Sequence, residues 1–152
     1  MPILIKPELI ELDYRRRLHG HLPTMKFAHG TENFPNEQWK QFYKNTVNAD
    51  PGETVYRLVF CEECAEYVGE AGYHFDHSEN KHMLDLIIGF DKRSEGYGNA
   101  ALKLLEDEAV SNHVSCLYTR ILKDNPAYTF LTKRGFTEVS ETDDDLLLMK
   151  QL

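Results

Sequence analysis

The stretch from Arg93 to Leu102 contains residues with the types and spacing of an anion-binding loop. Gly96 and Gly98 are separated by one residue, follow an apolar run and stand where a helical pattern begins. Glycines allow the backbone to approach a ligand closely, and the first N–H groups of a helix have no acceptor within that helix. The sequence therefore predicts a site for a phosphate or pyrophosphate at this point.

Two cysteines form a second candidate site, because Cys61 and Cys64 have the spacing of half a zinc ribbon. No second pair follows at a suitable distance, Cys116 stands alone, and none of the seven histidines forms a pair at helical metal-binding spacing flanked by an acid. We therefore expect no metal, with a metal-dependent protein that uses Cys61 and Cys64 as an alternative. Strand-like segments at 54–60 and 66–75 predict that both cysteines lie in the loop of a hairpin.

Length and composition predict one soluble globular domain over residues 1–152. Hydrophobic residues make up 41% and charged residues 28%, and no apolar run is long enough to span a bilayer. The opening residues 1–6 are too short for a signal peptide, and an odd number of cysteines, three, favours a reducing cytoplasm. The formal net charge of −8 disfavours nucleic acid and favours a cationic partner, although solubility alone explains the charge equally well.

Hydrophobic periodicity predicts how the elements that carry these residues are ordered. A third strand at 82–90 should follow the hairpin, and a strand, helix and strand at 82–90, 98–111 and 115–122 imply a right-handed parallel crossover. We expect an α/β (α+β) fold with a mixed, mostly antiparallel sheet of about seven strands and flanking helices. The remaining segments are partly extended at 3–12, helical at 13–22, 36–48 and 125–134, and a closing hairpin at 136–140 and 146–152.

From residue 54 to 150 the chain resembles the GNAT superfamily of acetyl-CoA-dependent N-acetyltransferases. The loop Arg93-x-x-Gly96-x-Gly98 is similar to the family's coenzyme A loop, and it is entered from an apolar strand. Two further segments match in the same order along the chain: Val68-Gly69-Glu70, and 124–127 leading to Lys133-Arg134-Gly135-Phe136.

The resemblance implies that acetyl-CoA is the cosubstrate, with the pantetheine arm between strands 83–90 and 115–122 where they splay apart. It implies that the main chain of Ile88 and Phe90 contacts the pantetheine. It also implies that the rest of the coenzyme is contacted by Arg93, Ser94, Glu95, Gly96, Tyr97, Gly98, Asn99, Asn125 and Lys133. Ser94 and Glu95 depart from the family, which often has glycine and a basic residue there.

Residues 96–101 also fit the Gly-x-Gly-x-x-Gly/Ala fingerprint of dinucleotide-binding domains. That fingerprint should follow the first strand of a doubly wound domain, with most of the domain still to come. Here three strands precede the loop and a hairpin closes the chain, so coenzyme A is favoured. A turn without any ligand remains the structural alternative.

Transfer to an amine requires a group that takes a proton, because an alkylamine has a pKa near 10. Glu70 and Asp85 lie on the strands beside the splay, and we slightly favour Glu70 as the general base, with His74 and His82 behind them. A polar residue on a sheet face or an anchor for the substrate ammonium is the alternative role of both acids. The family's usual tyrosine donor to the leaving thiolate is replaced by Leu131, or Phe130 in another alignment, so Tyr128, Tyr97 or solvent would serve.

The acceptor expected from the resemblance is an amine of a small molecule or peptide, in a pocket built by residues 14–39 and 138–147. We expect no nucleic-acid or membrane partner, and a monomer or homodimer. The alternative function is a coenzyme A-binding regulatory module with weak or no catalysis. Of these predictions, the donor is specified far better than the acceptor.

Overall fold

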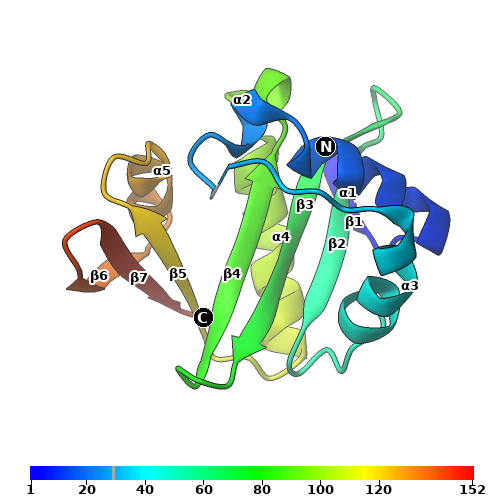
Figure 1. Cartoon of the computed structure of the whole chain (residues 1–152). Coiled ribbons are helices and arrows are strands. Elements are labelled where there is room, and N and C mark those ends of the chain that lie inside the picture. Colours follow the sequence, from blue (N-terminus) through cyan, green and yellow to red (C-terminus); the bar gives the residue numbers. More distant parts are fainter. Residues whose placement is uncertain (29) are drawn as a thin grey trace.

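A computed structural model describes residues 1–28 and 30–152 and contains a seven-stranded mixed sheet (Figure 1). The strands lie in the order β1-β2-β3-β4-β5-β7-β6, with all neighbouring pairs antiparallel except β4 and β5. Their bounds are Pro2–Ile5 (β1), Val55–Cys61 (β2), Glu66–Asp76 (β3), Lys81–Ile88 (β4), Cys116–Leu122 (β5), Thr137–Glu141 (β6) and Asp145–Gln151 (β7). The expected fold class is confirmed.

Helical segments flank this sheet, and α4 packs behind it in the view of Figure 1 while α1 and α3 lie in front. The α-helices are Leu12–His19 (α1), Leu22–Met25 (α2), Trp39–Phe42 (α3), Tyr97–Ser111 (α4) and Ala127–Lys133 (α5). Shorter turns are the 3-10 segments Leu9–Glu11, Asn36–Gln38 and Phe90–Lys92 and the π segment Tyr43–Val47. None of the helices within residues 1–28 and 30–152 is long and apolar enough to cross a membrane.

Two hydrophobic clusters hold these layers together, one on each face of the sheet. Leu102 and Leu105 of α4 and Leu131 of α5 pack against buried strand residues such as Leu117. On the other face, Leu12 and Trp39 cover Leu58 of β2. The N-terminal segments therefore cover one face of the sheet around β2, and α4 covers the opposite face.

The parallel strands β4 and β5 lie together at one end and diverge toward the other (Figure 1). Met83 and Tyr118 are their paired residues in the described part of the chain. Because parallel strands joined by a helix cross over on one face of the sheet, α4 returns the chain from β4 to β5 as predicted. The divergence exposes the side of β4 that carries the residues after Met83.

The N-terminal third differs from its predicted elements. The strand β1 ends at Ile5, because Pro7 interrupts the extended segment, and it pairs with the edge of β2. The helix predicted at 36–48 is divided into 3-10, α and π turns. Large aromatic side chains and weak helix formers such as Asn45 and Thr46 make packing, rather than propensity, decide this geometry. The short helix α2 was not predicted.

Candidate functional site

The loop between β4 and α4 has a backbone conformation that leaves its N–H groups available. Ser94 and Gly96 both have positive φ, 66° and 89°, and Gly96 is the residue directly before α4. The N–H of Ala100 donates to the carbonyl oxygen of Gly96 at 3.1 Å, so the N–H groups of residues 97–99 have no acceptor within the helix. Gly96 adopts the left-handed conformation without steric cost because it has no Cβ. Ser94 adopts it at a steric cost.

Arg93 ties this loop to the end of β4 and to α2. Its Nε donates to the carbonyl oxygen of Ile88 at 3.0 Å, and its NH2 nitrogen donates to the carbonyl oxygen of Thr24 at 2.7 Å. The N–H of Phe90 donates to Oγ1 of Thr24 at 3.1 Å. Since the N–H of Gly89 donates to β3, the carbonyl of Ile88 points away from β3 toward the side where β5 diverges. Arg93 and Thr24 thus hold both main-chain groups expected to contact the pantetheine.

The start of α4 also contacts α5. A Cβ at Gly98 would lie 3.4 Å from the ring of Phe130, so the helix and this ring are in close approach. Arg134 stacks 4.0 Å from the centroid of the Phe130 ring and donates from Nε to Oδ1 of Asn99 at 2.7 Å. Two other predicted coenzyme contacts lie at the two ends of α5. Oδ1 of Asn125, just before the helix, accepts from the N–H of Ala127 at 2.9 Å, and Lys133, its last residue, is exposed.

Glu70 on β3 lies in a buried ion-pair cluster. Its carboxylate accepts from NH1 of Arg15 at 2.8 and 2.9 Å, from the hydroxyl of Tyr56, and lies 2.6 Å from Nε2 of His19. The Arg15 guanidinium lies over the rings of Phe34, Phe42 and Tyr56, with the Phe42 centroid at 4.5 Å. The side chain of Glu70 is only 4% exposed, so this cluster fastens α1 to the sheet.

The same partners determine the protonation of Glu70. Burial by itself raises the pKa of a carboxyl group, but Arg15, His19 and Tyr56 outweigh burial and lower the pKa of Glu70 from 4.5 to about 2. A carboxylate with so low a pKa is a weak proton acceptor near neutral pH. The slight preference for Glu70 over Asp85 as a base therefore loses its electrostatic support.

Asp85 and His74 form a second pair on the same face of the sheet. Asp85 is opposite Gly72 in the register of β3 and β4. Because side chains alternate along a strand, Asp85 shares a face of the sheet with Glu70 and His74, the face opposite to α4. Nδ1 of His74 lies 2.6 Å from Oδ2 of Asp85, and the two side chains are 48% and 53% exposed. The hydrogen bond to Asp85 raises the pKa of His74 above 6.5, despite partial burial. The structure thus brings together two of the predicted candidates.

The hydroxyl candidates for protonating a thiolate lie in different places. Tyr128 is on α5, and its hydrogen bond with Glu138 raises the pKa of its hydroxyl. Leu131, at the position of the family's tyrosine, is buried in the core. Tyr97 at the start of α4 donates to Sγ of Cys61 at 3.3 Å. His82, another proton-transfer candidate, has Nε2 2.8 Å from the carbonyl oxygen of Gly52, away from the pair on β3 and β4.

Charge near the loop is mixed, and no metal cluster accompanies it in the described residues. Lys92 pairs with Glu66, whereas Glu95 is exposed next to the predicted phosphate site. Among residues 1–28 and 30–152, no group of three or more His, Cys, Asp or Glu side chains has a metal-binding arrangement. The loop therefore offers an anion the backbone N–H groups of residues 97–99, with Glu95 opposing it.

Several residues of this region were missed from the sequence. Arg15, Thr24 and Arg134 each bond to a predicted site residue or to its main chain. Arg134 was within a recognised segment, so its position next to the loop was accessible to inference. Arg15 and Thr24 lie on short N-terminal helices whose contacts with β3 and with the loop after β4 span 55 and 69 positions of the chain, and no local pattern signals such pairing.

Comparison with known proteins agrees with the class that this fold and loop define, an acyltransferase-like α/β protein with a splayed parallel strand pair. The Acetyltransferase (GNAT) family matches residues 15–136, and the chain belongs to this family. Comparison with curated protein sequences gave no match.

Solved structures share the fold over essentially the whole chain. A GNAT-family acetyltransferase from Streptococcus pneumoniae is 16% identical, with 100% of both chains covered and a TM-score of 0.81. Spermidine N-acetyltransferase from Vibrio cholerae, in complex with coenzyme A and spermine, is 13% identical over 99% of this chain and 95% of that chain, with a TM-score of 0.79. PaiA N-acetyltransferase from Thermoplasma acidophilum, in complex with coenzyme A, is 13% identical over 100% and 99%, with a TM-score of 0.73.

Proposed function

We propose that the protein is an acetyl-CoA-dependent N-acetyltransferase that transfers an acetyl group directly to an amine of a small molecule or peptide. The observation that carries the proposal is the separation of β4 from β5, followed directly by the Gly96 loop and the start of α4. Family membership supports acetyl transfer, and relatives of this fold were solved with coenzyme A. Acetyl-CoA supplies the acetyl thioester, and the residues of this chain bind it and carry out the proton transfers.

The donor site would use the N–H groups of residues 97–99 for the pyrophosphate, because they lack acceptors within α4. The carbonyl of Ile88 and the N–H of Phe90 would face the pantetheine once Arg93 and Thr24 release them. Released from Ile88, the Arg93 guanidinium would be free to pair with a phosphate. Glu95 opposes this binding, so the affinity for acetyl-CoA should depend strongly on Arg93.

For proton transfer we assign the His74–Asp85 pair, with Asp85 orienting the ring. Nδ1 of His74 bonds to Asp85, which leaves Nε2 as the atom that accepts the proton of the attacking amine. Asp85 lies two residues past Met83 along β4, toward the end at which β4 and β5 separate, and His74 lies beside it on β3. Tyr128 remains the proposed donor to the leaving thiolate, because a tyrosine hydroxyl carries its proton at neutral pH.

An amine acceptor is supported by charge and by one relative. The net charge of −8 favours a cationic substrate, and the relative from Vibrio cholerae is a spermidine acetyltransferase. A coenzyme A-binding regulatory module is the second candidate. The buried Leu131 at the position of the usual tyrosine favours it, because that side chain cannot protonate a thiolate.

Two measurements test the donor and the reaction separately. Acetyl-CoA binding is measured by calorimetry, and thiol release is measured across a panel of polyamines, amino sugars and peptide amines. Arg93→Gln should weaken acetyl-CoA binding about tenfold, because it removes a charged hydrogen-bond donor. Arg120→Gln is the matched control, since Arg120 pairs with Glu79 at the far end of β4 and should bind normally.

The outcomes separate the two candidates. Release of thiol that requires an amine, at a rate reduced by His74→Gln, supports the enzyme. Tight binding of acetyl-CoA without stimulation by any amine supports the regulatory module instead. If acetyl-CoA does not bind, or if Arg93→Gln and Arg120→Gln behave alike, the donor site is wrong.

A further inference from the structure

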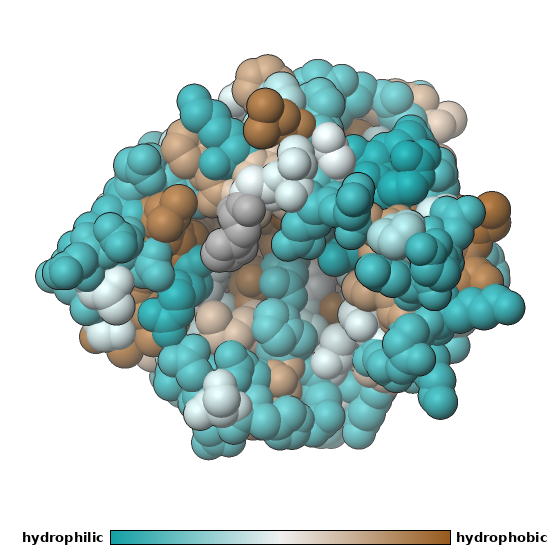
Figure 2. All heavy atoms as spheres, in the orientation of Figure 1, coloured by the Kyte–Doolittle hydropathy of each residue, from teal (hydrophilic) through white to brown (hydrophobic). Residues whose placement is uncertain are grey.

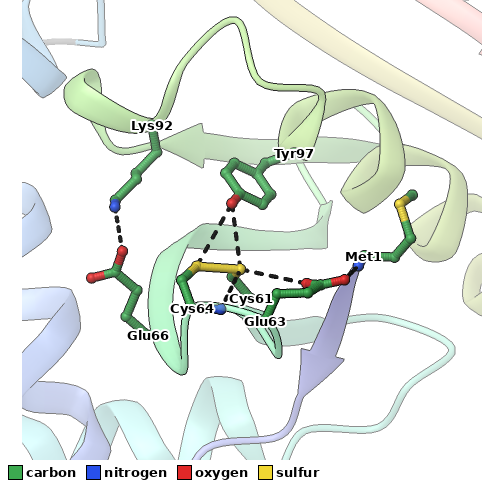
Figure 3. Close-up of a disulfide and its surroundings, with 7 residues drawn as sticks. All are labelled: Met1, Cys61, Glu63, Cys64, Glu66, Lys92 and Tyr97. Atoms are coloured by element: carbon green, nitrogen blue, oxygen red, sulfur yellow. Dashed lines mark hydrogen bonds and ion pairs between the residues drawn. A yellow bond between two sulfur atoms is a disulfide. The ribbon is translucent and has the colours of Figure 1, made fainter.

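The turn between β2 and β3 contains a sulfur pair that the proposed reaction does not use. Cys61 is the last residue of β2 and is 2% exposed, whereas Cys64 lies in the turn and is exposed. A disulfide joins the two residues, whose Cα atoms are 5.6 Å apart (Figure 3). The third cysteine, Cys116, is free.

Tyr97 connects this pair to the donor loop. Its hydroxyl donates to Sγ of Cys61 at 3.3 Å and lies 3.7 Å from Sγ of Cys64, as Figure 3 shows. Tyr97 is also the first residue of α4 and follows Gly96 directly. A cavity of about 820 Å³ lies between the turn and the loop, and both contribute to its lining. One side chain therefore contacts the sulfurs and begins the helix whose N–H groups would bind coenzyme A.

The chemistry of the pair suits exchange better than reinforcement of the fold. A disulfide that closes a loop with only two intervening residues restricts the unfolded chain least, so it contributes little as a staple. Two donors, the N–H of Cys64 at 3.2 Å and the Tyr97 hydroxyl, point at Sγ of Cys61 and favour its departure as a thiolate, whereas Oε2 of Glu63 at 3.6 Å opposes it. Cys64 is the sulfur exposed to an attacking thiol.

We propose that Cys61 and Cys64 form a reversible dithiol–disulfide site that exchanges with an external dithiol, and that its state changes the affinity for acetyl-CoA through Tyr97. A thiolate of the external dithiol attacks Sγ of Cys64, and Sγ of Cys61 leaves as a thiolate. The second thiolate of the reagent then attacks the reagent's other sulfur, which is bonded to Cys64 in the mixed disulfide, and Sγ of Cys64 leaves as a thiolate. Two electrons and two protons move to the protein, and the reagent becomes a disulfide.

Oxidation should favour acetyl-CoA binding, a readout that rests on the proposed function. In the oxidised pair the sulfurs carry no charge, and Tyr97 is held at the start of α4. Reduction separates the two sulfurs, so the Tyr97 hydroxyl loses the fixed pair that holds it at the start of α4. We expect the reduced protein to bind acetyl-CoA about fivefold more weakly, a typical coupling between two sites.

The experiment compares the full chain after treatment with oxidised dithiothreitol and with dithiothreitol, each removed by desalting. Alkylation followed by mass spectrometry counts free thiols, and calorimetry measures acetyl-CoA, which has no free thiol to reduce the pair. Tyr97→Phe removes the hydroxyl contact and should abolish the affinity difference between the two states. Tyr118→Phe and Cys116→Ser are the matched controls, and both should keep the difference.

Three results would overturn the proposal. They are the same count of free thiols after both treatments, equal affinity in the two states, and a difference that survives Tyr97→Phe. If neither state binds acetyl-CoA, the proposed function fails. Hydrogen exchange at residues 95–100 then decides whether the state of the sulfur pair affects the loop. Exchange that differs between the redox states supports the link through Tyr97, and identical exchange refutes it.

Discussion

Glu70 and Asp85 are carboxylates on adjacent strands and the same face of the sheet, yet their surroundings are opposite. Glu70 is buried under α1 and bonded to Arg15, His19 and Tyr56, and its pKa is about 2. Asp85 is about half exposed, and its partner is His74. The N-terminal segments cover one carboxylate and not the other, so coverage rather than residue type separates the structural site from the reactive one.

This difference bears on which group handles protons. A buried carboxylate held by an arginine in an aromatic surround is fixed in charge and position, which suits fastening α1 to β3. A half-exposed pair whose histidine has its pKa raised by the neighbouring carboxylate can exchange protons with solvent and substrate. Figure 2 shows that this face of the molecule is mostly hydrophilic, with scattered hydrophobic patches.

The strongest test of the comparison removes the partner of the buried carboxylate. Arg15→Met leaves Glu70 buried without its cation, and the free energy of unfolding should fall by about 3–5 kcal/mol in urea titrations. Arg17→Met is the control, because Arg17 is 60% exposed beside Asp13 and should cost at most about 1 kcal/mol. Equal losses in the two variants would mean that the Glu70 cluster is no stronger than a surface pair.

The buried carboxylate also predicts a pH dependence of stability. Because folding lowers the pKa of Glu70 from 4.5 to about 2, the stabilisation is complete above the unfolded pKa and is lost as pH falls through this range. The loss should amount to about 3 kcal/mol between pH 5 and pH 2. Urea titrations at several pH values should show this slope in the native chain and a flatter slope in Glu70→Gln. The same slope in both chains would assign the effect to other carboxyl groups.

Removing the exposed carboxylate, Asp85, should lower activity and leave stability nearly unchanged. Asp85→Asn should reduce the rate of amine acetylation about a hundredfold while the free energy of unfolding changes by less than about 1 kcal/mol. The physical reason is that Asp85 orients the His74 ring but packs against little else. Steady-state kinetics and urea titration on the same preparation check both halves. Glu79→Gln, at another exposed pair, should leave the rate unchanged. A rate loss matched by a stability loss would indicate a structural role for Asp85.

The pH profile separates orientation from mere proximity. His74 must be neutral to accept a proton, and Asp85 raises its pKa, so activity falls as the solution becomes more acidic than that raised pKa. Asp85→Asn removes the raising contact, so the acidic limb of kcat/KM should move to lower pH. A limb that stays in place in Asp85→Asn would show that another group titrates.

The sequence carried enough information to place His74 next to Asp85, but not to place the partners of Glu70. The strands at 66–75 and 82–90 and the turn between them define a hairpin whose register places Asp85 diagonal to His74, eleven positions away. The Gly96 loop was likewise predictable, because glycine spacing after a strand has few structural meanings. These are local patterns, and they transfer directly to structure.

The Glu70 cluster depended on information that local patterns do not contain. Its partners lie 51 and 55 positions away on α1, and the segment after α1 lacks regular helical periodicity because packing sets its turns. The low pKa of Glu70 arises only when these segments close over β3. Predicting a base from residue type and strand position therefore favoured the carboxylate that the N-terminal segments later cover.

The smallest expected effect concerns salt. Raising the ionic strength to about 1 M shortens the screening length to about 3 Å, which weakens the exposed attraction between His74 and Asp85 more than a buried one. The pKa of His74, followed by NMR of its ring protons, should fall toward 6.5. The acid transition that Glu70 contributes to stability should move less, since solvent ions do not reach a carboxylate that is 4% exposed. A larger shift at Glu70 than at His74 would mean that the N-terminal segments open in solution, and then the buried acid would again be a candidate for the base.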